Sequence, residues 1–440
     1  MKVSRLEPDL SGIVNWPTLS TTKKSVVTVG VFDGMHRGHQ SLIKRVVELA
    51  RQQGDYAVVV MFDPSPKQVH SYADAHSGAD LPSGEAAQDR DELMPERERL
   101  RIMRELGVDW VLSVQYTLAF AAKSFRFFLG ALVGKIGMST LVLGQDATMG
   151  AGRAGNVEAI ERLAEATGVF TLDIVDDAGP GYTWVPGEIE PQAPAGAGEP
   201  GDPLEGMNKA ELRAWTKAHQ CKKVRIWSST NVRYLLASGR ASEAAAILGH
   251  AHAVEGEVVH GEQRGRELGY PTANISEDYE GYMPVDGVYA GWLVDLGPSE
   301  AAASAGAGAA GVSGAVSGST ASGGADGTSA ADGGLETVTF SSAGKDARLA
   351  PGSPWRWPAD ISIGSKETFA GEGQQYERVL EVNAIVGDDW LDLYGHRVRV
   401  EFLAYLRPQA KFASGEALSA QLQQDAADSL RLARQAEAGS

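Results

Sequence analysis

Residues 30–39, GVFDGMHRGH, constrain the fold more than any other stretch of this sequence. They follow an apolar, β-branched run over residues 26–31 and precede apolar residues at helical spacing over about 39–51. A second apolar run covers residues 56–62. Strand, helix and strand connected in this way predict a parallel βαβ unit. This ten-mer then lies on the loop after the first strand, at a helix N-terminus, where open α/β sheets bind ligands and free N–H groups favour phosphate.

The side chains of the ten-mer suit a phosphate site. It contains three glycines, Gly30, Gly34 and Gly38, which allow the backbone to approach a ligand closely. His36 and His39 are three residues apart, so they share a face of the first helical turn and can donate hydrogen bonds to a triphosphate. An H-x-x-H pair alone is mostly chance, and the strand–loop–helix context makes it specific. A zinc site is the weaker alternative, because no third Cys or His ligand is nearby.

The ten-mer resembles the GxFDGxHxGHQ signature of the bacterial bifunctional riboflavin kinase/FMN adenylyltransferases, or FAD synthetases. The H-x-G-H part belongs to the wider nucleotidyltransferase superfamily. The resemblance implies that this loop binds the nucleotide and that its two histidines are catalytic. The nucleotide-binding residues so implied are Gly30, Phe32, Asp33, Gly34, His36 and His39.

Composition limits the class of protein. A chain of 440 residues accommodates two or three domains. The 40 basic and 57 acidic residues give a formal net charge of −17, which argues against general nucleic-acid binding but not against nucleotides held by local loops. The single Cys221 excludes an internal disulfide and suits a reducing compartment. With no signal-peptide core and no apolar run of membrane length, we expect a soluble cytoplasmic protein that binds no membrane. The sequence does not indicate an oligomeric state.

The first half alternates predicted helices and strands after a polar lead-in over residues 1–24. The second strand exits through FDPSP, which resembles the family's FDPHP loop with Ser65 in place of His, and an ordinary strand exit fits equally well. The resemblance implies flavin binding by Asp63. A polar stretch over residues 70–91 predicts a mobile loop. Further helices are expected at 95–106, 124–136 and 157–167, and further strands at 108–114, 141–144 and 170–175.

The loop over residues 144–156, GQDATMGAGRAGN, departs from the family. Relatives carry Asn-Phe-x-Phe-Gly where this chain has Asp146, Ala147, Thr148, Met149 and Gly150. The resemblance implies that Asp146 contacts flavin and Asn156 the nucleotide. Loss of both aromatics removes surface that would pack on an isoalloxazine ring. We therefore expect this domain to bind ATP but to adenylate FMN poorly compared with typical relatives.

A second phosphate motif follows a Pro-, Gly- and Glu-rich insertion over residues 180–210. WSSTNVR, residues 227–233, resembles the family's ISSTxIR. Hydroxyls at a helix N-terminus with an arginine one turn later can hold the β- and γ-phosphates of ATP, and a plain helix cap is the alternative. The residues concerned are Ser228, Ser229, Thr230 and Arg233. Helical segments to residue 248 close the first predicted domain, residues 1–248.

Near residue 250 the pattern changes to strands. The stretch 254–274, VEGEVVHGEQRGRELGYPTAN, lacks a Walker A loop and resembles the flavokinase signature. The resemblance implies that Gly265 and Gly269 contact nucleotide and that Thr272 and Asn274 hold Mg²⁺, for which hydroxyl and amide oxygens are suited. Glu377 aligns with the general base that deprotonates riboflavin, and Glu381 is the competing candidate.

The rest of the second half is expected to complete a β-barrel. Ala, Gly and Ser dominate residues 298–350, which predicts a disordered insertion. Strands are predicted at 380–386 and 397–403, and a helix over 414–435 is expected to face the core with its leucines. Arg407, in an L-R-P match to the family, is implied to bind flavin.

The predicted architecture is a Rossmann-like α/β nucleotidyltransferase domain, residues 1–248, and an antiparallel β-barrel kinase domain, residues 249–440. The resemblance implies two activities. The barrel would phosphorylate riboflavin to FMN with Mg²⁺ and ATP, and the first domain would adenylate FMN to FAD with release of pyrophosphate. Two alternatives remain open: a kinase with weak or no FAD synthetase activity, and a non-catalytic flavin-binding regulator.

Overall fold

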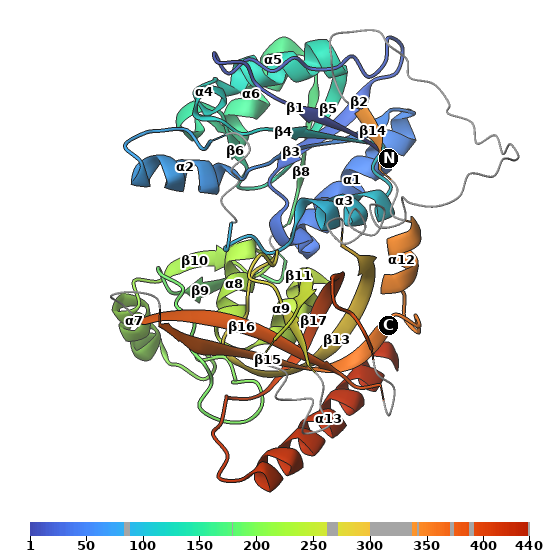
Figure 1. Cartoon of the computed structure of the whole chain (residues 1–440). Helices are drawn as coiled ribbons and strands as arrows, with labels where there is room; N and C mark the ends of the chain where they lie inside the picture. Colours follow the sequence, from blue (N-terminus) through green and yellow to red (C-terminus); the bar gives the residue numbers. More distant parts are fainter. Residues whose placement is uncertain are drawn as a thin grey trace, which may run out of the picture.

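A parallel sheet and a closed barrel form the two halves of the computed structural model (Figure 1). The structure describes residues 1–82, 89–177, 179–261, 272–299, 337–340, 343–369, 374–386 and 391–438. In Figure 1 the sheet occupies the upper half of the molecule and the barrel the lower half. The predicted fold class is thus confirmed.

The upper half contains a seven-stranded sheet in the order β14-β1-β4-β3-β2-β5-β8. All neighbours pair in parallel except β14 with β1. The strands are β1 (Lys2–Leu6), β2 (Ser25–Gly30), β3 (Tyr56–Phe62), β4 (Trp110–Val114), β5 (Met138–Gly144), β8 (Thr171–Val175) and β14 (Thr337–Thr339). The predictions of β2, β3, β4, β5 and β8 are confirmed, because apolar and β-branched residues dominate each of these short runs.

Helices cover both faces of this sheet. They are α1 (Arg37–Gln53), α2 (Pro66–Ala75), α3 (Glu96–Glu105), α4 (Leu118–Ala121), α5 (Phe125–Ile136) and α6 (Val157–Thr167). One apolar core lies under α1 and α3, and a second lies under α5 and α6. The expectation of a mobile loop over residues 70–91 is wrong at its start, because α2 runs to Ala75. Ser65 caps α2 by accepting the Gln68 N–H at 3.2 Å, and the apolar side chains of Val69 and Ala73 on this helix are buried.

Residues 182–248 connect the two halves. They form a two-stranded antiparallel sheet of β9 (Tyr182–Val185) and β10 (Lys222–Arg225), and the helices α7 (Lys209–Ala218), α8 (Ser229–Ala237) and α9 (Ala241–Leu248). The predicted insertion over 180–210 therefore contains the strand β9. Helices α8 and α9 share a core with Leu93 and Tyr282, and Ala241 belongs to the barrel core. The predicted domain boundary after residue 248 thus follows helices that contact both halves.

The lower half is a closed antiparallel barrel in the order β11-β12-β16-β15-β13-β17. The strands are β11 (His252–Val259), β12 (Ala273–Ile275), β13 (Gly287–Pro298), β15 (Arg356–Phe369), β16 (Gln374–Ala384) and β17 (His396–Arg407). Alternate apolar residues of each strand fill its interior. The helix α13 (Gly415–Ala438) packs on the barrel through Asp425, Ser429 and Ala433, whereas the leucines expected to face the core are half-buried.

The Ala-, Gly- and Ser-rich insertion is partly ordered, so the expectation of disorder from 298 to 350 is wrong at its end. The short β14 pairs with β1 at the edge of the parallel sheet, and α12 (Ala343–Leu349) follows it. Figure 1 shows the orange β14 beside the blue β1 in the upper half. Residues 300–336, which make up most of the insertion, lie outside the described residues. A β-branched Thr-Val-Thr run meets an edge strand with free hydrogen-bonding groups, which explains its order.

Candidate functional site

The ten-mer loop turns sharply between β2 and α1. Phe32 adopts a left-handed conformation with φ of 57°, and its ring is buried beside Gly30. Gly34 follows with φ of 76°. His36 then caps α1, because its Nδ1 accepts the backbone N–H of His39 at 3.4 Å. The predicted loop at a helix N-terminus is present.

The two histidines stack with ring centroids 3.7 Å apart. Burial lowers the pKa of His36 to about 3 and holds the pKa of His39 well below its usual range, and Arg225 adds to both effects. Both imidazoles are therefore neutral at pH 7. Because Nδ1 of His36 accepts a hydrogen bond, its proton resides on Nε2. Nδ1 of His39 is buried with no partner among the described residues.

Asp33 cross-links the loop to the second phosphate motif. Its carboxylate accepts the Leu93 N–H at 2.8 Å and pairs with Arg233. Ser229 donates to the Asp33 carbonyl at 2.8 Å. Burial raises the pKa of Asp33, while Arg233 opposes that rise. The structure thus brings the two motifs together, and it engages Arg233 with a carboxylate.

Two of the other predicted nucleotide contacts cap helices. Ser228 caps α8 by accepting the Asn231 N–H at 3.2 Å, and Thr230 follows in its first turn. Asn156 caps α6 by accepting the Ala159 N–H at 2.9 Å. A capping role accounts for Ser228 and Asn156 without a ligand.

Sequence reasoning missed Arg225 beside the histidines. Its guanidinium pairs with Asp177 and with Asp146, the residue implied to bind flavin. Asp177 is buried against two glycines, since a Cβ on Gly38 or Gly144 would collide with it. An arginine in the run K-K-V-R before the second motif was the available signal.

An aromatic cleft of about 680 Å³ opens beside the ten-mer at the carboxyl ends of the strands. Its aromatic lining comes from β3, α4, α5 and the loop after β4, and comprises Phe62, Tyr116, Phe120 and Phe128. Gly30, Ala147 and Met149 line it as well. Aromatic side chains therefore line this cleft from elements outside the 144–156 loop.

Asp63 does not line this cleft. It faces a charged cavity of about 640 Å³ between the halves, which Glu92, Arg97 and Glu280 also line. Burial raises the pKa of Asp63, and that of Glu92 to about 8. Flavin binding by Asp63 stays a prediction that this geometry does not support.

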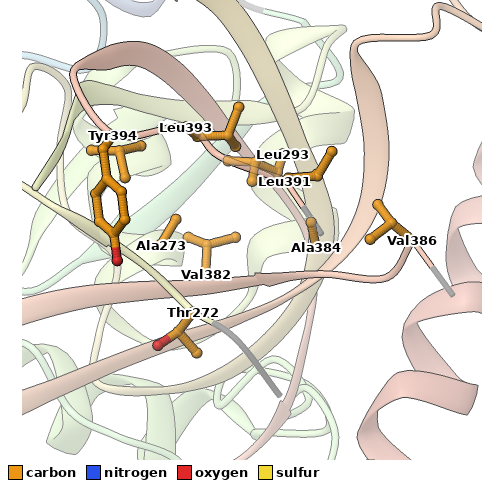
Figure 2. A pocket seen from close by; sticks show the side chains of 10 residues that line it. Thr272, Ala273, Leu293, Val382, Ala384, Val386, Leu391, Leu393 and Tyr394 are labelled. Carbon is orange, nitrogen blue, oxygen red and sulfur yellow. The ribbon is translucent and has the colours of Figure 1, made fainter. Parts of the chain in front are cut away.

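In the barrel, Thr272 and Asn274 flank the start of β12. The strand register sets Asn274 directly opposite Glu381 of β16, and Glu381 opposite Ser362 of β15. A small apolar cavity of about 40 Å³ adjoins Thr272. Figure 2 shows Thr272 at one end of the cavity beneath the ring of Tyr394, with the other labelled side chains all apolar. The register thus sets an amide and a carboxylate side by side on neighbouring strands, and the Thr272 hydroxyl borders an apolar recess.

The remaining predicted residues are dispersed. Glu377 lies on β16 opposite Lys366, four residues from Glu381. Arg407 forms a bidentate pair with Asp425 of α13, with its closest approach at 2.6 Å, and so ties the barrel to its covering helix. Gly265 and Gly269 lie outside the described residues.

Among the residues that the structure describes, no group of three or more His, Cys, Asp or Glu side chains is arranged to hold a metal ion. None of the described helices combines the length and apolar character needed to cross a membrane.

Comparisons with known proteins agree with the division into a parallel-sheet domain and a barrel domain. The family model for FAD synthetase matches residues 18–184, and the model for riboflavin kinase matches residues 248–433. The bifunctional riboflavin kinase/FMN adenylyltransferase of Escherichia coli strain K12 is 27% identical over 401 residues, which cover 91% of this chain and 90% of the relative. The protein of the same description from Listeria monocytogenes is 25% identical over 408 residues, 93% and 92% of the two chains.

A solved structure shares the overall arrangement. It is described as a macrolide-efflux protein from Streptococcus pneumoniae and matches with a TM-score of 0.59, at 23% identity, over 96% of this chain and 97% of the other. At that identity the likeness shows the fold alone. The two matched domain models and the curated relatives, which extend over most of the chain, show that it belongs to the bifunctional riboflavin kinase/FMN adenylyltransferase family.

Proposed function

We propose that this chain converts riboflavin to FMN in its barrel and FMN to FAD in its parallel-sheet domain, with ATP as the second substrate of both reactions. The observation that carries the proposal is the presence of both matched domains in one chain, each with a recess beside its family motif. The single Cys221 is consistent with a cytoplasmic location, which is part of the proposal.

In the kinase reaction, Glu381 takes the proton from the 5′-hydroxyl of riboflavin. The cross-strand pairing of Glu381 with Asn274 supports this choice over Glu377, which lies roughly 13 Å further along the strand. Thr272 and Asn274 offer hard oxygen ligands, which fit Mg²⁺ delivered with ATP. Bound there, Mg²⁺ supplies charge neutralisation on the transferred phosphoryl group.

In the adenylyl transfer, the FMN phosphate attacks the α-phosphate of ATP and pyrophosphate leaves. The neutral His36 and His39 orient the triphosphate as hydrogen-bond donors. Arg225 adds positive charge when its carboxylate partners yield to phosphate. The aromatic cleft holds the isoalloxazine ring by stacking.

A chromatographic assay of the purified chain with riboflavin, Mg²⁺ and ATP, scoring FMN and FAD separately, tests the proposal. We expect both products. Thr272→Ala should abolish FMN formation and leave the adenylation of supplied FMN intact. Loss of both activities by a folded Thr272→Ala variant would contradict separate sites, and a wild type that makes neither product would indicate a flavin-binding regulator.

A kinase with weak FAD synthetase activity is the second candidate, and the observation behind it is the loss of aromatics at Ala147 and Met149. Its test replaces both residues with phenylalanine and measures FAD formation. A rise supports this candidate. Wild-type FAD formation as fast as that of ordinary relatives would refute it and would assign flavin stacking to the aromatic cleft.

A further inference from the structure

Arg99 of α3 is a charged side chain that is buried inside the protein. It is 1% exposed and ranks among the largest fully buried side chains of the described residues. Removing a guanidinium from water is costly, so the groups that it binds indicate why it is there. The adenylation mechanism proposed above does not use Arg99.

The contacts of Arg99 converge on three loops. Its Nη1 donates to the carbonyl of Val31 at 3.1 Å. Its Nη2 donates to Glu92 at 2.6 Å and lies 3.4 Å from a carboxylate oxygen of Asp63. Val31 begins the ten-mer turn after β2, Asp63 follows β3, and Glu92 belongs to the segment before α3. One guanidinium thus joins the exits of two neighbouring parallel strands to a third segment.

The Val31 carbonyl lies where the aromatic cleft meets the turn of the ten-mer loop. Val31 lines the aromatic cleft, and the next residues, Phe32 and Asp33, begin the turn that leads to the histidines. Asp33 in turn accepts the N–H of Leu93, the residue after Glu92. Arg99 and Asp33 therefore both cross-link the turn after β2 to the segment before α3.

The helix that carries Arg99 is anchored independently. Its neighbours Arg97 and Glu98 pair with Glu255 and Arg399 of the barrel, with the Glu98–Arg399 pair at 2.6 Å. Loss of the Arg99 side chain should thus leave α3 in place and release only the loops. This makes a change in loop geometry separable from a change in fold.

We propose that Arg99 is a positioning residue for FMN adenylation, which sets the ten-mer loop at its working distance from the flavin cleft by holding Val31, Asp63 and Glu92 together. The inference rests on the adenylyl transfer proposed above. Lysine retains the charge but lacks the planar fork that reaches three loops at once. Displacement of a reacting group by about 1 Å costs on the order of 100-fold in rate.

The test compares Arg99→Met, Arg99→Lys and Arg101→Met in the full chain. Arg101 is the matched control, because it lies on the same helix and pairs with Glu98 and Glu105 rather than with the loops. Riboflavin phosphorylation reports folding of the barrel in the same molecules, and the midpoint of thermal unfolding reports folding of the sheet domain. For Arg99→Met we expect kcat for FAD formation to fall about 100-fold, with KM for FMN and ATP changed less than about 3-fold, and kinase activity retained. Arg99→Lys should restore part of the rate, and Arg101→Met should match the wild type.

Each other outcome counts against the inference. Arg99→Met with wild-type FAD formation overturns it, and so does a loss expressed only in KM. If Arg99→Met loses kinase activity as well, Arg99→Lys decides: a lysine variant with full kinase activity and unimpaired FAD formation overturns the inference. A wild type that makes FMN but no FAD refutes adenylation itself, and the inference with it.

Discussion

At the scale of single residues, Glu381 is the proposed base of the kinase reaction. We expect Glu381→Gln to lower FMN formation by about 10²–10⁴-fold, because the 5′-hydroxyl of riboflavin loses its base. Glu377→Gln is the matched control on the same strand and should change the rate by less than about 3-fold. Adenylation of supplied FMN should be unaffected in both variants. A larger loss in Glu377→Gln than in Glu381→Gln would assign the base to Glu377.

Asp360 gives a residue-level prediction on pH. Burial raises its pKa to about 6 from 3.8, even though Ser429 donates to its carboxylate at 2.6 Å. Between about pH 4 and 6 the folded chain thus binds more protons at this group than the unfolded chain, so its contribution to the free energy of unfolding falls as pH rises and is constant above about pH 6.

Asp360→Asn should remove this dependence. We expect the variant to exceed the wild type in unfolding free energy by at most about 3 kcal/mol at pH 7.5, and the difference to shrink towards pH 4.5. Urea unfolding followed by tryptophan fluorescence at both pH values measures it. A difference that does not depend on pH would mean that Asp360 is ionised in the folded barrel at pH 4.5.

At the scale of elements, the aromatic cleft is assembled from parts far apart in the chain. Phe120 of α4 packs against Phe62 of β3 with ring centroids 5.8 Å apart, and against Tyr116 at 5.9 Å. The short α4 is fixed by Thr117, which accepts the Phe120 N–H at 3.1 Å. The aromatic lining of the cleft therefore depends on packing between elements that are distant in sequence.

Phe120→Ala tests whether the aromatic lining of the cleft binds flavin. We expect KM for FMN in the adenylation reaction to rise about 10-fold through lost stacking, and riboflavin phosphorylation to stay unchanged. Phe127→Ala on α5 is the control, because Phe127 is 48% exposed and outside the cleft. A Phe120→Ala variant with an unchanged KM would show that flavin binds elsewhere.

At the scale of the whole molecule, contacts from the insertion join the two halves. Val338 of β14 pairs with Val3 of β1, and Phe340 packs against the core of the sheet. Asp346 of α12 pairs with Arg104 of α3. Arg348 of the same helix donates to Asp295 of the barrel at 2.7 Å. A segment of the kinase half thus completes the edge of the other domain.

Replacement of residues 337–349 by a Gly–Ser segment of equal length tests this connection. We expect the midpoint of thermal unfolding to fall by roughly 2–5 °C through loss of strand pairing and of the Phe340 contact, with both activities retained. The same replacement at residues 313–325 serves as the control and should leave the midpoint unchanged. Equal midpoints for the two variants would mean that the segment 337–349 contributes no stability.

Local pattern was sufficient for the elements that hold the first motif. The apolar runs of β2 and β3 and the helix α1 appear where the sequence predicts them, and His36 lies at the helix start. The reason is physical: strand burial, helical periodicity and the glycine turn are encoded within about 30 neighbouring residues. The family motifs likewise identified both domains.

Only the tertiary structure decided which distant side chains meet. The hydrogen bond of Arg99 to Val31, the pairing of Arg225 with Asp146, and the edge pairing of β14 with β1 join residues between 68 and 337 positions apart in sequence. The register of β12 on β16 brings Glu381 to Asn274, and a slip of one residue would turn Glu381 to the other face. Such contacts depend on how finished elements pack and pair, so no local pattern in the sequence specifies them.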